Sequence, residues 1–118
     1  AGAKAVINKA GYALSALFTD DMIDTGGTIV SAAELLLNKG ATEVWAMATH
    51  GVLSGPAVER LQNSRIDRVI LTNTLPIPSE KQIDKIEVIS VAPIIADALS
   101  AVFDDTSVSE IFGGENQA

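Results

Sequence analysis

Apolar side chains recur at helical spacing in three segments of the chain. Residues 28–39, 56–64 and 93–103 each place them on one face of a helix. In the first segment these are Ile29, Ala32, Ala33, Leu36 and Leu37, and in the last Ile94, Ile95, Ala98, Leu99 and Val102. Gly40 suits the end of the first helix, and Pro56 suits the first turn of the second. Three helices are therefore predicted.

Short apolar runs separate these helices. Residues 43–49, 68–73 and 86–91 are short and largely apolar rather than cleanly alternating, which is typical of strands buried on both faces. Residues 74–79 contain two prolines, which predict a loop there. Helices that alternate with such strands predict an α/β fold with three layers, α/β/α, around a mostly parallel sheet.

The first 18 residues are harder to assign. Helical spacing relates four apolar residues, Ile7, Ala10, Leu14 and Leu17. The loop that begins near Asp20, however, indicates that a strand precedes it. We place a strand at 13–19 and leave 1–11 undecided. A length of 118 residues fits a single domain, 1–118, in which 1–18 is unassigned and 113–118 is a tail.

Composition narrows the function classes. The chain has no cysteine, which excludes disulfide frameworks, thiolate metal sites and cysteine nucleophiles. A net charge of −7 and five aromatic residues argue against binding to nucleic acid. No apolar run approaches the roughly 20 residues of a membrane span, and no signal peptide is evident, so we expect a cytoplasmic protein. With only eight basic residues, anion binding falls to backbone N–H groups, hydroxyls or a metal.

Residues 19–28, TDDMIDTGGT, carry the clearest chemistry because they join a strand to a helix. Gly26 and Gly27 permit a tight turn, and the first N–H groups of the helix point at the same spot. Thr25 and Thr28 add hydroxyl donors, so the segment forms a phosphate-binding loop. Asp20 and Asp21 are acceptors suited to sugar hydroxyls or hydrated Mg²⁺. An ordinary capped turn beside solvated carboxylates is the alternative, since one glycine-rich turn has low specificity.

The same segment resembles the phosphoribosyl-diphosphate motif of type I phosphoribosyltransferase-fold proteins. Further segments are similar to the ribose-phosphate pyrophosphokinase family within that superfamily, namely residues 48–57 (ATHGVLSGPA), 69–76 (VILTNTLP) and 107–112 (SVSEIF). Their order and spacing match along residues 19–112. The resemblance implies a phosphoribosyltransferase-like fold and synthesis of phosphoribosyl diphosphate from ATP and ribose 5-phosphate, with Mg²⁺.

Residue by residue, the resemblance implies three binding groups. Asp20 and Asp21 would hold the ribose hydroxyls, and Asp24, Thr25, Gly26, Gly27 and Thr28 would hold the 5-phosphate. Ser107 and Ser109 fall where the family binds phosphate or ADP as an effector. No catalytic residue and no metal ligand of this chain is assigned.

The chain also departs from the family. Family members are more than twice as long, and most of the ATP site and a loop with a catalytic lysine and arginine have no match here. We therefore expect the 118 residues alone to be inactive, and by resemblance we expect a homo-oligomer. A non-catalytic phosphoribosyl-binding or regulatory subunit and a phosphoribosyltransferase remain alternatives. His50 has both a structural and a ligand-binding interpretation, and the structural one is favoured.

Overall fold

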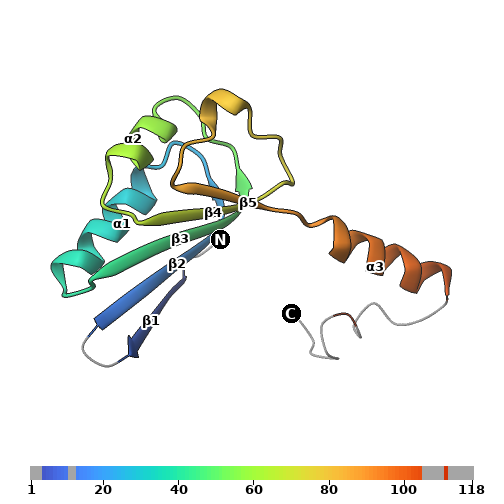
Figure 1. The fold of residues 1–118 in the computed structure, drawn as a ribbon, viewed down its shortest axis with the longest axis horizontal. Helices are drawn as coiled ribbons and strands as arrows, with labels where there is room; N and C mark the ends of the chain where they lie inside the picture. The colour runs from blue at the N-terminus through green and yellow to red at the C-terminus, as the bar shows by residue number, and fades with distance from the viewer. Residues whose placement is uncertain (1–3, 11–12, 105–110, 112–118) are drawn as a thin grey trace.

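A computed structural model describes residues 4–10, 13–104 and 111, with side chains described for 15–104 and 111. The strands are β1 (Lys4–Ala10), β2 (Ala13–Ile23), β3 (Glu43–Gly51), β4 (Arg68–Thr72) and β5 (Ile86–Ile89). The helices are α1 (Gly27–Asn38), α2 (Ala57–Asn63), α3 (Ala92–Phe103) and the short 3₁₀ helix η1 (Ser79–Lys81) (Figure 1). The three predicted helices and the strands predicted at 43–49, 68–73 and 86–91 are confirmed, with ends shifted by at most two residues. The strand predicted at 13–19 is also confirmed and extends to Ile23.

The strands form one sheet in the order β1-β2-β3-β4-β5. β2, β3, β4 and β5 are parallel, so the mostly parallel sheet is confirmed. β1 runs antiparallel to β2, from the pair Lys4 and Thr19 to the pair Ala10 and Ala13. The undecided segment 1–11 therefore contains a strand. Its helical spacing was uninformative because pairing with β2, a contact between chain segments, decides its conformation.

The core lies between the sheet and helices α1 and α2. In β3, Val44, Ala46 and Ala48 are buried and alternate with the half-buried Trp45 and Met47. The buried side of the sheet faces the apolar sides of the two helices. Ile29 and Ala33 of α1 are buried as predicted, with Ala32, Leu36 and Leu37 packed against the same core.

The helices α1 and α2 lie together on one face of the sheet (Figure 1). Right-handed crossovers between strands that follow chain order place each connecting helix on that same face. Helix α3 extends away from the sheet, and its apolar face is exposed to solvent (Figure 1). The exposed residues are Ile94, Ile95, Leu99, Val102 and Phe103. The α/β class is confirmed, but among the described helices none forms the expected layer on the second face.

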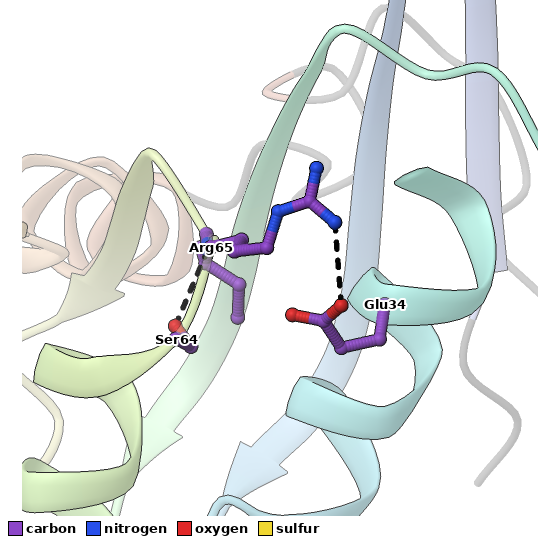
Figure 2. Close-up of polar contacts among 4 residues, drawn as sticks. Glu34, Ser64 and Arg65 are labelled. Atoms are coloured by element: carbon purple, nitrogen blue, oxygen red, sulfur yellow. Dashed lines mark hydrogen bonds and ion pairs between the residues drawn. The ribbon is translucent and has the colours of Figure 1, made fainter. Parts of the chain in front are cut away.

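A glycine ends α1, and an ion pair joins α1 to the segment that follows α2. Gly40 adopts a left-handed φ of 105° after α1, and its N–H donates to the Leu37 carbonyl, as predicted for a terminating glycine. Beyond α2, Arg65 Nη1 lies 3.5 Å from Glu34 Oε2 of α1 (Figure 2). Both side chains are well exposed, so this ion pair contributes little to stability.

Candidate functional site

The predicted phosphate loop connects β2 to α1 at the carboxyl edge of the parallel strands. Such edges are the usual ligand-binding side of open α/β sheets. Gly26 immediately precedes the helix and has φ 77° and ψ −4°, a left-handed conformation that glycine adopts without strain. Gly26 is also buried, and a Cβ there would lie 3.6 Å from the Cα and carbonyl oxygen of Ala57. The loop is therefore packed against the start of α2.

The segment after β3 holds the loop in place. The N–H groups of Val52 and Leu53 both donate to the Ile23 carbonyl at 3.0 Å, and Ser54 N–H donates to the Asp24 carbonyl at 3.0 Å. Leu53 has a φ of 50°, which is strained for a leucine. Its side chain is fully buried, so the surrounding core can maintain that conformation.

A cavity of about 160 Å³ opens beside the loop. Its lining contains six of the seven residues predicted to bind the sugar phosphate. These are Asp20, Asp24, Thr25, Gly26, Gly27 and Thr28, joined by Met22 and Ile29. The lining therefore combines hydroxyls, carboxylates and the first turn of α1, whose N–H groups lack partners within the helix. This combination suits a phosphate with an attached polyol.

The sequence predicts a strand that ends at residue 19, before the two aspartates. In the structure both aspartates lie within β2. The strand continues to Ile23 because it keeps pairing with β3 up to Gly51. Each carboxylate accepts a hydrogen bond from the next backbone N–H, Asp20 from Asp21 at 2.8 Å and Asp21 from Met22 at 2.9 Å. Asp21 is exposed and does not line the cavity.

The pKa of the Asp21 carboxyl lies below its ordinary value. The main cause is a side-chain hydrogen bond with Asp20, and the N–H of Met22 adds to it, while partial desolvation acts in the opposite direction. The Asp21 carboxylate is therefore ionised at neutral pH. An ionised carboxylate accepts hydrogen bonds only, which matches a role toward hydroxyl groups or a hydrated cation.

A second hollow, of about 190 Å³, adjoins the first at Asp20. Its lining comes from the carboxyl ends of β2, β3, β4 and β5, and it is mostly apolar. The residues are Thr19, Asp20, Met47, Ala48, Thr49, Ile70, Leu71, Thr72 and Ile89. Sequence analysis did not identify this hollow, because it is formed by four strands that only the sheet order brings together.

His50 is held by a hydroxyl from the loop after β4. Its Nδ1 lies 2.8 Å from Thr74 Oγ1. The hydroxyls of Thr72 and Thr74 also donate to the Thr49 carbonyl, at 2.6 and 3.1 Å. The histidine thus belongs to a network that ties the end of β3 to β4, which agrees with the structural interpretation.

Arg60 is a residue that sequence analysis missed. Its Nη1 donates to the Thr25 carbonyl at 3.0 Å, across 35 positions of the chain. From the sequence, anion binding is expected to fall to backbone groups, hydroxyls or a metal. No local pattern pointed to Arg60, because it lies in α2 and meets the loop only through the packing of two helices.

One prediction from the sequence concerns residues that the structure does not describe. Ser107 and Ser109, the expected effector-binding residues, lie outside the described residues. Within residues 4–10, 13–104 and 111, no three His, Asp or Glu side chains group to hold a metal ion. No helix in this part of the chain is long and apolar enough to cross a membrane.

Comparison with known proteins agrees with this geometry. Residues 5–113 match the family model of the phosphoribosyl synthetase-associated domain. The chain is 57% identical over 100 residues to a ribose-phosphate pyrophosphokinase of Clostridium acetobutylicum, covering 85% of this chain and 31% of that protein. It is also 57% identical over 97 residues to the enzyme of that name from Aquifex aeolicus, covering 82% of this chain and 31% of the relative.

A solved structure has the same fold. The phosphoribosylpyrophosphate synthetase of Mycobacterium smegmatis superimposes with a TM-score of 0.73 at 44% identity, covering 86% of this chain and 37% of that one. This likeness confirms the phosphoribosyltransferase-like α/β fold. The chain spans about a third of the length of the curated relatives it matches. By the match over residues 5–113, the chain belongs to the phosphoribosyl synthetase-associated domain family.

Proposed function

We propose that this chain is the ribose-5-phosphate-binding part of a ribose-phosphate pyrophosphokinase. The reaction would transfer the diphosphoryl group of ATP to the 1-hydroxyl of ribose 5-phosphate, giving phosphoribosyl diphosphate and AMP for nucleotide biosynthesis. The observation that carries the proposal is the cavity in which Asp20 stands beside the loop of residues 24–28, in a member of this family. The relatives' shared name supports the same reaction.

In this proposal each part of the site has one task. The hydroxyls of Thr25 and Thr28 and the N–H groups at the start of α1 bind the 5-phosphate. Asp20 and Asp21 accept hydrogen bonds from the ribose hydroxyls, and the low pKa of Asp21 supports its acceptor role. In phosphoryl transfer such residues act mainly by positioning the acceptor, because little covalent chemistry falls to the protein.

Magnesium and ATP complete the proposed reaction. Mg²⁺ prefers one or two carboxylates together with phosphate and water oxygens, which Asp20 and Asp21 fit. When bound, Mg²⁺ would neutralise charge on the transferred phosphates. Because two thirds of the relatives' length has no counterpart in these 118 residues, we propose that the chain alone binds ribose 5-phosphate without catalysing transfer.

Regulation, assembly and location form the remaining parts of the proposal. Ser107 and Ser109 would bind phosphate or ADP as effectors, by the family resemblance alone. The exposed apolar face of α3 supports a homo-oligomer, because such a face is costly to leave in water. The acidic, cysteine-free composition supports a cytoplasmic location.

Calorimetric titration of the chain with ribose 5-phosphate in Mg²⁺ buffer tests the proposal. We expect saturable binding that is lost in the double variant Asp20→Asn, Thr28→Val and kept in Asp97→Asn, which removes an exposed carboxylate of α3. Circular dichroism checks that all three proteins are folded. Absence of binding by the folded wild-type chain would refute the proposal. Release of AMP from ATP by the chain alone, dependent on ribose 5-phosphate, would contradict its expected inactivity.

A further inference from the structure

Three successive carbonyls, at the end of β2 and in the phosphate loop, accept hydrogen bonds from one segment of the chain. The Ile23 carbonyl accepts from Val52 and Leu53, and the Asp24 carbonyl accepts from Ser54. The Thr25 carbonyl accepts from the guanidinium of Arg60. All these donors come from the β3–α2 connection and from α2. The loop backbone is thus oriented by one contiguous segment, in which Arg60 supplies the last contact.

The orientation of these carbonyls determines where the N–H groups point. The chain has no cis peptide bond among the described residues, and in a trans peptide the C=O and N–H of one unit point in opposite directions. The N–H groups of Asp24, Thr25 and Gly26 therefore point away from the segment that holds the carbonyls. These three residues line the cavity of the candidate site. Successive N–H groups aimed at one space form an anion-binding arrangement.

Arg60 contacts the loop from behind and does not line this cavity. It lines a separate hollow between α1 and α2, together with residues such as Val30, Glu34 and Glu59. Its Nη1 would be only 3.4 Å from a Cβ at position 27, so the guanidinium lies close against the first residue of α1.

We propose that Arg60 is a positioning residue for phosphate binding, which acts by fixing the Thr25–Gly26 peptide so that its N–H points into the cavity. The inference rests on the proposed function, since it concerns the same loop. The ligand group is a phosphate monoester, and the arginine does not line the cavity that would hold it. Its positive charge also favours an anion at the loop, although solvent exposure weakens that contribution.

Three variants test the role of Arg60. Arg60→Met removes the donors and keeps much of the aliphatic volume, while Arg60→Lys keeps the charge and one donor group. Arg65→Met is the matched control, because Arg65 is another exposed arginine whose Nη1 pairs with Glu34 of α1 and not with a loop carbonyl (Figure 2). Calorimetry with ribose 5-phosphate and with inorganic phosphate measures affinity. Nuclear magnetic resonance follows the Gly26 amide in the free chain and during titration.

We expect Arg60→Met to weaken binding of both ligands about tenfold, the range for one lost charged hydrogen bond at an exposed position. Arg60→Lys should recover part of that loss, and Arg65→Met should bind like the wild type. The Gly26 amide resonance should shift in the free Arg60→Met chain and respond less to phosphate. A purely structural role would instead lower the unfolding free energy and leave the Gly26 amide of the folded chain unchanged.

Two negative results are distinguishable. If the wild type binds ribose 5-phosphate and Arg60→Met binds equally well, the role of Arg60 is refuted and the proposed function stands. If the folded wild type binds neither ligand, the proposed function fails and the positioning role fails with it. An unchanged Gly26 resonance in Arg60→Met would overturn the orientation argument independently of any ligand.

Discussion

Substitution of Gly26 by alanine separates the backbone requirement of the phosphate loop from its packing. Gly26 has a φ of 77°, where an L residue costs about 1–2 kcal/mol because its Cβ approaches the carbonyl oxygen. A Cβ there would meet Ala57 at no less than 3.6 Å, which is ordinary van der Waals contact. The added methyl therefore fits, and only the backbone strain remains.

The predicted magnitude follows from this φ angle and this contact distance. We expect Gly26→Ala to lower the free energy of unfolding by about 1–2 kcal/mol, with no further penalty for overpacking. Gly40→Ala is the matched control. Gly40 also has a positive φ, of 105°, and a Cβ there would have nothing within 4 Å, but it lies at the opposite end of α1. Both variants should be destabilised to a similar extent.

Equilibrium urea unfolding and calorimetry with ribose 5-phosphate distinguish the two glycines. Gly26→Ala should also weaken binding, because relief of the strain rotates the peptide whose N–H faces the cavity, whereas Gly40→Ala should bind like the wild type. A loss above about 4 kcal/mol in Gly26→Ala would show that Ala57 cannot accommodate the methyl, which refutes the packing argument. Unchanged binding in that variant would refute the need for a left-handed residue in the loop.

Two further predictions concern charged side chains. The Asp21 carboxyl should titrate below the ordinary aspartate pKa when its carboxyl-carbon resonance is followed by nuclear magnetic resonance. Because the pKa is lower in the folded chain, the stability that this carboxylate contributes is present at neutral pH. That stability is lost as the pH falls through the folded pKa. A pKa at or above the ordinary value would contradict the hydrogen bonding that stabilises the Asp21 carboxylate. Arg68→Met should remove the guanidinium whose Cζ lies 5.4 Å from the centroid of the Trp45 ring. We expect the fluorescence of this single tryptophan to change and the free energy of unfolding to fall by about 0.5–1 kcal/mol. Unchanged emission would count against the contact.

The amino-acid sequence by itself determined the local elements and the composition of the site. The 3.6-residue spacing in 28–39 predicted α1 because burial of one helix face needs that period. The pair Gly26 and Gly27 after two aspartates predicted the loop, since the conformation at Gly26 depends on the residue type itself. These features are local, so a single stretch of sequence contains enough information to infer them.

Only the tertiary structure decided how the elements combine. The strand β1 formed where the spacing was helical, because pairing with β2 outweighs local preference. The order of the strands placed α1 and α2 on one face, which no periodicity encodes. The contact of Arg60 with the Thr25 carbonyl joins residues 35 positions apart and requires α2 to pack beside α1. Such contacts depend on the relative placement of whole elements, and therefore on the energy of the assembled core.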